Sequence, residues 1–292
     1  MAGLTLIELV DRESARLDQA GVSFGQGTTN AYDEAAWLVQ WALGLPLDAL
    51  DGQADRTVSA EEAAKVSALI DRRIATRQPA AYLTGEAWLQ GVPFFVDERV
   101  IIPRSLIAEP LADGTIDVWL SDRTRRVLDL CTGNGSLAVL AALAWPEVEV
   151  DAADLSDDAL AVARINVERH GLQQRITLLK SDGLAAVHGP YDLILCNPPY
   201  VNADSMAALP AEFRAEPALA LAGGADGMDF VRALLRAAPA CMSADAVLVL
   251  EIGHERTHFD AAFPTLDAVW LDTSAGEDQV LLLTREALLT LR

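Results

Sequence analysis

Cysteine is scarce in this 292-residue sequence, and long hydrophobic runs are absent. Cys131, Cys196 and Cys241 are odd in number and widely spaced, which excludes a disulfide framework and a paired Cys-x-x-Cys zinc site. We therefore expect reduced thiols and no bound metal. No stretch approaches the roughly 18 apolar residues of a membrane span, and the first residues lack the basic start and apolar run of a secretory signal. The sequence predicts a cytoplasmic protein without membrane contact.

Positive charge is also scarce. Lysine and arginine total 22 against 43 acidic residues, which gives a formal net charge of −21. Lys65 and Lys180 are the only lysines. Because binding to a nucleic-acid backbone depends on cations that neutralise phosphates, no direct nucleic-acid binding is expected and a basic protein partner is favoured. The acidity is equally consistent with a role in solubility alone, so charge by itself does not choose a function.

Helical periodicity dominates the first part of the chain. Apolar positions recur at helical spacing near residues 4–17 and again near residues 35–43. Ser59 followed by Glu62 has the spacing of a capping box at the start of a third helix. These patterns predict a small helical domain over residues 1–90.

The period changes after this domain. Residues 91–104 are rich in aromatic and β-branched residues broken by Gly and Pro, which predicts a hairpin connector. Over residues 105–292, seven short apolar runs alternate with helical segments: VLDL, VEVDAAD, ITLLKSD, YDLILCN, AVLVLEI, AVWLDT and QVLLLT. This alternation predicts an α/β, Rossmann-like domain with a seven-stranded, mostly parallel sheet. Ligands of such sheets bind beyond the carboxyl ends of the strands.

A glycine-containing loop follows the first predicted strand and opens a helix; it consists of Cys131, Thr132, Gly133, Asn134 and Gly135. Glycines allow a tight turn and close approach of the backbone to a ligand. Asp154 ends the next strand about twenty residues later, where a carboxylate can accept both hydroxyls of an adenosine ribose. NAD and S-adenosylmethionine both satisfy this pattern, so the loop and Asp154 leave either cofactor open.

Two more aspartates bear on that choice. Asp129 lies just before the loop, where its charge can meet the ammonium group of a methionine moiety, directly or through water. NAD has no cation there, so Asp129 favours S-adenosylmethionine. Asp182, followed by Gly183, ends the third strand and can accept a hydrogen bond from an adenine amino group. A single strand-end aspartate is often only a solvated residue, but three at successive strands are consistent with one ligand that spans them.

The most specific motif is the turn Asn197-Pro198-Pro199-Tyr200 after the fourth strand. Consecutive prolines cannot continue a central strand and have no N–H, so the turn presents two acceptors, the Asn197 side-chain oxygen and the Pro198 carbonyl. A planar NH2 group has two donors to match, and the acceptors would stabilise the positive charge that develops on its nitrogen during attack on a methyl group. Tyr200 can pack on the same group and orient it. The turn predicts methyl transfer to a planar amide or exocyclic amine nitrogen.

Four segments together resemble the protein N5-glutamine methyltransferase family, the HemK-like enzymes: IIPR at 101–104, DLCTGNG at 129–135, NPPY at 197–200 and EPALALAGGADGMDFVRALL at 216–235. The resemblance covers nearly the whole chain. Residues 209–221 and 279–289 are most similar to the branch called PrmB, which acts on large-subunit ribosomal protein three. In the release-factor branch the proline-arginine motif continues toward paired acids and threonine, whereas here Pro103-Arg104 leads into Ser105-Leu106.

The resemblance implies S-adenosylmethionine as cofactor, contacted by Cys131 to Gly135, Asp154, the Asp182-Gly183 turn and Asn197. It implies that Asn197 to Tyr200 hold a glutamine of the basic ribosomal protein, and that the enzyme methylates its side-chain N5. Residues 1–90 would then recognise the substrate, and residues 105–292 would form the methyltransferase domain.

Several alternatives stay open. Nucleic-acid amino-methyltransferases use similar turns, although the acidic balance and the two lysines disfavour them. A release-factor methyltransferase, a nicotinamide oxidoreductase and a non-catalytic adaptor are further possibilities. His254-Glu255-Arg256-Thr257-His258 matches the H-E-x-x-H pattern of zinc peptidases, in which both histidines share one helical face. No third histidine follows it, and Pro264 leaves the segment little length for a helix.

Overall fold

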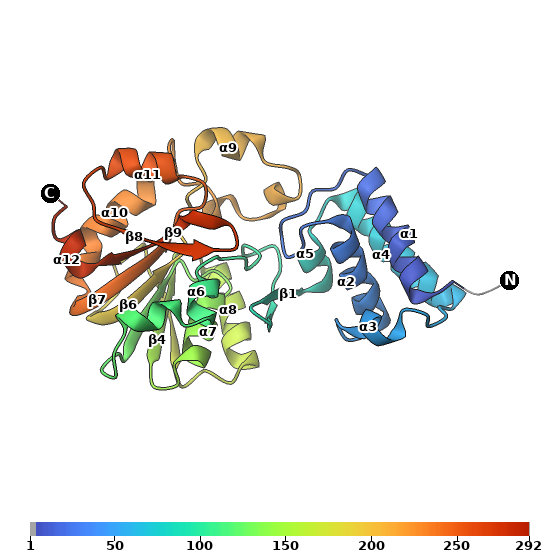
Figure 1. Ribbon diagram of the computed structural model, residues 1–292, viewed down its shortest axis with the longest axis horizontal. Coiled ribbons are helices and arrows are strands. Elements are labelled where there is room, and N and C mark those ends of the chain that lie inside the picture. Colours follow the sequence, from blue (N-terminus) through green and yellow to red (C-terminus); the bar gives the residue numbers. More distant parts are fainter. Residues whose placement is uncertain (1–3, 292) are drawn as a thin grey trace. The chain divides into compact units, whose positions relative to one another are not determined.

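A computed structural model describes residues 4–291 of the chain (Figure 1). The predicted domain limits at residues 1 and 292 lie outside this range. Two compact units are present: residues up to 87 together with 210–216, and residues 88–209 together with 217 onward. None of the described helices combines the length and the apolar character that crossing a bilayer requires.

The first unit is helical. Its core contains Leu9, Leu38 and Ile70, one from each long helix and all fully buried. The capping box predicted from Ser59 and Glu62 is present, and both of its reciprocal hydrogen bonds are formed. The helices of this unit are α1 (Leu6–Gln19), α2 (Ala31–Leu43), α3 (Ala49–Gln53), α4 (Ala60–Thr76) and α5 (Ala80–Thr84).

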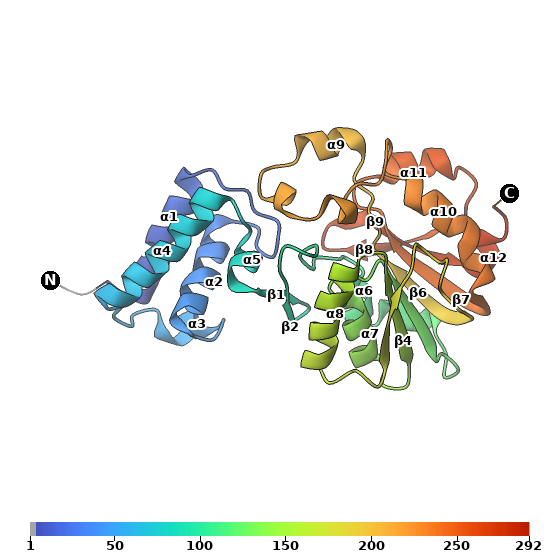
Figure 2. The ribbon, with the colours of Figure 1, turned by 180° about the vertical axis from the view of Figure 1, so that it is seen from behind.

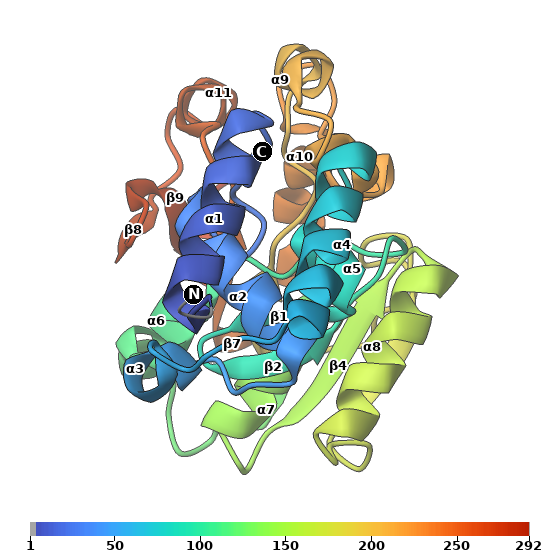
Figure 3. The ribbon, with the colours of Figure 1, turned by 90° about the vertical axis from the view of Figure 1, so that its right-hand side faces the viewer.

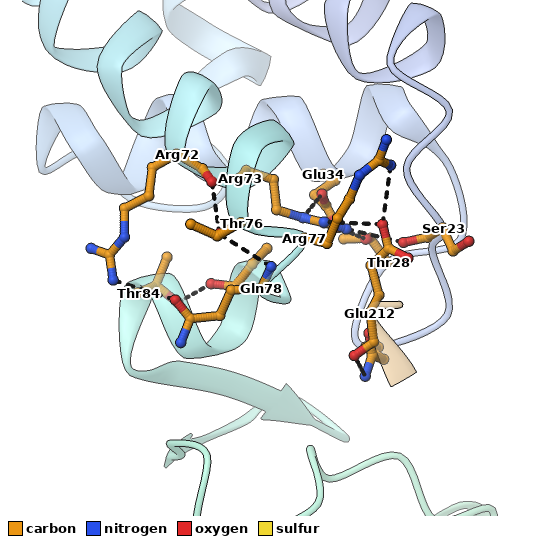
Figure 4. A network of polar contacts seen from close by, with 12 residues as sticks. Ser23, Thr28, Glu34, Arg72, Arg73, Thr76, Arg77, Gln78, Thr84 and Glu212 are labelled. Carbon is orange, nitrogen blue, oxygen red and sulfur yellow. Dashed lines mark hydrogen bonds and ion pairs between the residues drawn. The ribbon is translucent and has the colours of Figure 1, made fainter. Parts of the chain in front are cut away.

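A buried ionic network joins the segment 210–216 to these helices (Figure 4). Arg73 of α4 is 1% exposed, and its Nε donates to Glu34 at 2.8 Å. Its Nη1 lies 3.5 Å from a carboxylate oxygen of Glu212, which Arg77 also contacts at 3.3 Å. Gln26 donates to the backbone carbonyl of Glu212 at 3.3 Å. The sequence did not predict that residues 210–216 pack with the helical unit, because the contacts join positions more than a hundred residues apart.

A two-stranded hairpin follows, formed by β1 (Glu86–Leu89) and β2 (Val92–Phe95). It begins before residue 91, where the sequence placed the start of the connector, and residues 96–104 contain no regular strand. The turn is made by Gln90 and Gly91, whose φ angles are 49° and 73°. Positive φ at both central residues is the geometry that suits the twist of two paired strands. Glutamine is not a usual residue for this turn, so the sequence did not indicate its position.

The second unit contains the predicted seven-stranded sheet, in the order β5-β4-β3-β6-β7-β9-β8. The central strands are parallel, and β9 pairs antiparallel with both β7 and β8. This confirms the α/β, Rossmann-like class I methyltransferase fold, and every predicted run is a strand. The strands are β3 (Arg126–Leu130), β4 (Glu149–Asp154), β5 (Ile176–Lys180), β6 (Tyr191–Cys196), β7 (Met242–Glu251), β8 (Val269–Thr273) and β9 (Gly276–Thr284).

Helices cover both faces of the sheet (Figures 2 and 3). Val127 of β3 belongs to the apolar core under α6 and α7, whereas its neighbour Leu128 belongs to the core under α10 and α11, as expected when successive side chains alternate between faces. The helices are α6 (Ala108–Ala112), α7 (Ser136–Ala144), α8 (Asp157–Arg169), α9 (Ala203–Ala208), α10 (Asp229–Ala237), α11 (Arg256–Ala262) and α12 (Arg285–Leu288).

Candidate active site

The glycine loop connects the carboxyl end of β3 to α7. Gly133 and Gly135 have φ angles of 55° and 82°, and a Cβ on Gly135 would lie 3.2 Å from the Cβ of Ala163 in α8. Cys131 also has a positive φ, 62°, although it is not glycine. Such strain costs about 1–3 kcal/mol and occurs where surrounding structure enforces it, often at ligand sites. At Cys131 the loop is therefore held in a conformation that the residue type does not favour.

Asp129 lies under this loop with 1% of its surface exposed. Its Oδ2 accepts hydrogen bonds from the Thr132 hydroxyl and from the Ala138 N–H at 3.0 Å. Its Oδ1 is buried and has no hydrogen-bond partner among the described residues. Burial raises the pKa of Asp129 to about 7. An unpaired buried acceptor beside a strained loop is a position where a ligand donor or cation fits.

Asp154 ends β4 beside the loop. One carboxylate oxygen accepts from the Gly133 N–H and the other from the Ser156 N–H, both at 2.9 Å. Burial raises the pKa of this carboxyl. Each carboxylate oxygen has a second lone pair, so Asp154 can hold the loop and still accept hydroxyl hydrogens.

Asp182 and Gly183 follow β5, the neighbour of β4. The Ser181 N–H donates to the Asp154 carbonyl at 2.9 Å, which places this turn next to the end of β4. Gly183 has a φ of 53°, and the Asp182 side chain is exposed. Both residues line a groove together with Phe230 and Leu234 of α10. An exposed acceptor beside an apolar groove suits the amino edge and flat face of a purine.

The Asn-Pro-Pro-Tyr turn follows β6, the other neighbour of β3. Because Leu130 pairs with Cys196, the residues after these two strands emerge side by side. Neither the Asn197 side chain nor the Pro198 carbonyl has a hydrogen-bond partner among residues 4–291. The two acceptors that the sequence singled out are thus unengaged and lie next to the glycine loop.

Tyr200, by contrast, is held from several sides. Its hydroxyl donates to Glu251 at 2.9 Å, an acceptor that the sequence analysis missed. A Cβ on Gly253 would lie 2.4 Å from a ring carbon of Tyr200, and one on Gly227 would lie 2.2 Å from its carbonyl oxygen. The segment AGGADG therefore needs glycine because the Asn-Pro-Pro-Tyr turn packs directly on its backbone. Val201 adds two backbone hydrogen bonds: its N–H donates to the carbonyl of Leu221, just before this segment, and its carbonyl accepts from the Gly223 N–H.

Asn166 of α8 is a second residue that the sequence analysis missed. It is fully buried, and its amide donates to the Asn134 carbonyl at 2.8 Å. The same side chain accepts from the Phe95 N–H at 2.7 Å and donates to the Phe95 carbonyl at 3.0 Å. Asn166 thereby ties β2 of the hairpin to the glycine loop. An apolar helical stripe interrupted by one asparagine was the available signal.

The H-E-x-x-H segment does not form the geometry of a zinc peptidase. His254 precedes α11, which begins at Arg256, so the two histidines do not share a helical face. Glu255 instead accepts from the Asn202 side chain at 2.7 Å and contacts His258 at 2.5 Å. Within residues 4–291, no group of three or more His, Cys, Asp or Glu side chains is placed to hold a metal. Through Glu255, the segment links the start of α11 to Asn202, which follows the Asn-Pro-Pro-Tyr turn.

Two family models match the chain. One, described as the methyltransferase small domain, matches residues 115–225, and the other, the PrmC N-terminal domain, matches residues 8–85. They correspond to parts of the sheet unit and of the helical unit.

Curated relatives are similar over almost the whole length. The chain is 57% identical to the ribosomal protein uL3 glutamine methyltransferase of Bordetella pertussis, over 98% of this chain and 97% of the relative. It is 51% identical to the protein of the same name in Burkholderia pseudomallei, over 96% and 94%. Among solved structures, the hMettl16 catalytic domain in complex with a MAT2A 3′UTR hairpin matches with a TM-score of 0.53 at 14% identity, over 77% and 81%. That last likeness concerns the fold alone.

Proposed function

The chain belongs to the family of ribosomal protein uL3 glutamine methyltransferases, and we propose that it carries out the reaction of that family. In this reaction, a methyl group passes from S-adenosylmethionine to the side-chain N5 of a glutamine in uL3, large-subunit ribosomal protein three. The observation that carries the proposal is the pair of acceptors, Asn197 and Pro198, which have no hydrogen-bond partner among the described residues and lie beside the glycine loop at the ends of neighbouring strands. We assign the helical unit to substrate recognition and the sheet unit to transfer.

We assign cofactor binding to Asp129, the loop Cys131–Gly135, Asp154, Asp182, Gly183 and Asn197. When bound, S-adenosylmethionine supplies a methyl group on a positively charged sulfur. The residues fit this ligand because the unpaired Oδ1 of Asp129 suits its ammonium group and the free lone pairs of Asp154 suit its ribose hydroxyls. The positive-φ loop brings backbone N–H groups close without an intervening side chain.

We assign the acceptor glutamine to Asn197, Pro198, Pro199 and Tyr200. The Asn197 oxygen and the Pro198 carbonyl accept the two amide hydrogens, and they stabilise the positive charge that grows on the nitrogen as its lone pair leaves conjugation. Tyr200 orients the amide. No strong base is required, because the alkylated nitrogen is acidic and can release its proton to water. The four residues therefore act by binding, orientation and electrostatics.

Replacing Asp154 with alanine should weaken S-adenosylmethionine binding by about 1–3 kcal/mol, roughly 5- to 150-fold in Kd, because two ribose hydroxyls lose their acceptor. Isothermal titration calorimetry measures this directly. Asp158→Ala, which removes an exposed acid of α8, is the matched control and should leave Kd unchanged. An unaltered Kd for Asp154→Ala would place the ribose elsewhere.

Cofactor affinity should rise with pH through the pKa of Asp129, about 7. The ammonium group favours ionised Asp129, so binding near pH 6 must release a proton that is mostly absent at pH 7.5, and the amino group stays mostly charged over that range. We expect Kd to fall up to about tenfold between these two pH values. Calorimetry at both should show this for the native protein and a flat profile for Asp129→Asn. A flat native profile would mean that Asp129 does not meet the ammonium.

To identify the methyl acceptor, the protein is incubated separately with purified uL3, a release factor and ribosomal RNA in the presence of labelled S-adenosylmethionine. Mass spectrometry then locates the label. Label should appear on a glutamine of uL3 only. Replacing that glutamine with asparagine should nearly abolish transfer, because one fewer methylene withdraws the amide from fixed acceptors. Given the net charge of −21, added salt should slow methylation at subsaturating uL3 much more than at saturation.

The other outcomes of this test separate the alternatives. Label on the release factor would show that the substrate is that of the release-factor branch, and label on RNA would overturn the proposal of a protein substrate. We further propose that the protein binds no nucleic acid directly and acts in the cytoplasm, where newly made ribosomal proteins are available. The acidic balance supports the first point.

A further inference from the structure

Glu251 is a buried carboxylate that joins two sequence motifs. It ends β7, is 3% exposed, and accepts the Tyr200 hydroxyl through Oε1 at 2.9 Å. Its Oε2 accepts the Ser105 hydroxyl at 2.6 Å and the Leu106 N–H at 2.9 Å. Ser105 and Leu106 directly follow the IIPR segment, and Tyr200 closes the Asn-Pro-Pro-Tyr turn. One side chain thus connects both motifs from the strand between β6 and β9.

The position would ordinarily suit an apolar residue, since the preceding strand residues 246–250 are all buried and hydrophobic. Removing a carboxylate from water is costly unless hydrogen bonds compensate it, and here three donors do so. All three donors come from other segments, so the carboxylate holds those segments in place relative to one another and to the end of β7. The Glu251 carboxylate therefore fixes the position of the Tyr200 side chain relative to the Ser105-Leu106 segment.

This geometry bears on the orientation of the Tyr200 ring. The backbone after Tyr200 is held by the two hydrogen bonds of Val201, and a ring carbon packs on Gly253. The hydroxyl at the far end of the ring is held by Glu251. Fixing a ring at both ends leaves it one orientation. We propose that Glu251 is a positioning residue for methyl transfer, which holds the Tyr200 ring and the Ser105-Leu106 backbone so that the acceptor amide stays in line.

The inference rests on the proposed function, in which Tyr200 orients the acceptor. The change Glu251→Gln keeps the side-chain shape but replaces one oxygen by NH2. The amide oxygen can accept from the Tyr200 hydroxyl or from the Ser105-Leu106 pair, but not from both. In the first case its NH2 meets the Leu106 N–H, which cannot accept. In the second case the Tyr200 hydroxyl must turn to accept from the NH2, and the charge-assisted hydrogen bond that holds the ring is lost. Because small misplacements of a reacting group cost up to about 10²-fold in rate, we expect kcat to fall by about that factor. Kd for S-adenosylmethionine should stay within about twofold, because Glu251 is not assigned to its binding.

The experiment measures kcat, KM for uL3 and calorimetric Kd for S-adenosylmethionine with the full-length protein. It compares Glu251→Gln, Tyr200→Phe and the double variant. If Glu251 acts through the Tyr200 hydroxyl, the double variant should be about as slow as the slower single one, because the two changes break one connection. A purely structural role would lower thermal stability without this non-additivity in kcat.

A matched control exists at the opposite end of β6. Tyr191 donates its hydroxyl to Asp151 at 2.5 Å, the same pair of groups in the same unit but away from the site. Tyr191→Phe and Asp151→Asn should therefore leave kcat within about twofold, whatever they do to thermal stability. Loss of kcat in these controls equal to that in Glu251→Gln would assign the effect to general destabilisation.

Native kcat in Glu251→Gln with cofactor binding intact would overturn the inference, as would multiplicative effects in the double variant. If Glu251→Gln does not fold, Ser105→Ala is the variant to test, because it removes only one of the three donors to Glu251. A several-fold loss of kcat with a native Kd for S-adenosylmethionine would support the inference. An unchanged kcat would overturn it. Failure of the proposed function is a separate result. A native enzyme that labels some acceptor other than uL3 refutes the substrate, and the same variants are then compared on that acceptor.

Discussion

Asn197→Ala should lower kcat by about two to three orders of magnitude. The side-chain oxygen has no hydrogen-bond partner among the described residues, so its removal leaves the folded protein with the same internal bonds. What is lost is an acceptor for charge that develops only in the transition state, by analogy with the loss of one oxyanion-hole donor. Steady-state kinetics with uL3 at saturating S-adenosylmethionine measures the change.

The split between binding and turnover distinguishes this variant from Asp154→Ala. Asn197 is also assigned to the cofactor, so a modest rise in the Kd of S-adenosylmethionine is expected, but most of the loss should remain at saturating cofactor. Asp154→Ala should show the reverse, with a large change in Kd that saturating cofactor largely offsets. A near-native rate for Asn197→Ala would show that the amide is held by other groups.

The largest effect on stability should come from Arg73→Met in the helical unit. The change leaves Glu34 and Glu212, both buried, without the cation that lies 2.8 Å from one and 3.5 Å from the other. Breaking a buried ion pair on one side costs about 3–5 kcal/mol, because an uncompensated charge stays out of water. Urea denaturation followed by circular dichroism measures the loss of unfolding free energy of the helical unit.

The deficit should depend on pH. Burial raises the pKa of Glu34 even with Arg73 present, so the fold favours its neutral form more than the unfolded chain does, and stability falls as pH rises from the ordinary glutamate pKa through that raised value. Without the positive charge of Arg73, the pKa of Glu34 should be raised further. The cost of Arg73→Met should therefore be greatest near neutral pH and shrink on acidification toward the ordinary glutamate pKa of about 4.3. Arg123→Met, which removes an arginine that is 85% exposed, is the control and should change little at any pH. A pH-independent deficit in Arg73→Met would indicate lost packing alone.

The strands and most of the site motifs were predictable because their signals are local. A buried parallel strand is a short apolar run, and a turn is marked by glycine or proline, so the seven strands could be identified from sequence. The capping box at Ser59 is likewise a pattern of four residues. The topology of such sheets then places Asp129, Asp154 and Asn197 at the same edge, because the carboxyl ends of parallel strands lie together.

Two local signals were weak or misleading. The hairpin starts at Glu86 and not at residue 91, because Gln90 and Gly91 make its turn; Gln90 adopts a positive φ, which its residue type does not indicate. The H-E-x-x-H pattern matched a zinc motif, but the chain becomes helical only at Arg256, so Glu255 is free to accept from Asn202. A pattern of residue types does not specify where a helix begins, and the metal geometry depends on that start.

The sequence by itself therefore determined the fold class, the positions of the glycine loop and of the Asn-Pro-Pro-Tyr turn, and the family, since each depends on neighbours along the chain. The tertiary structure alone decided which distant groups support them. Glu251 meets Ser105 from 146 positions away, Glu212 meets Arg77 from 135, and Asn166 meets Phe95 from 71. Each is a buried polar group whose burial is tolerated only because a partner satisfies it. That partner is chosen by how the elements pack, and no spacing within the sequence records it.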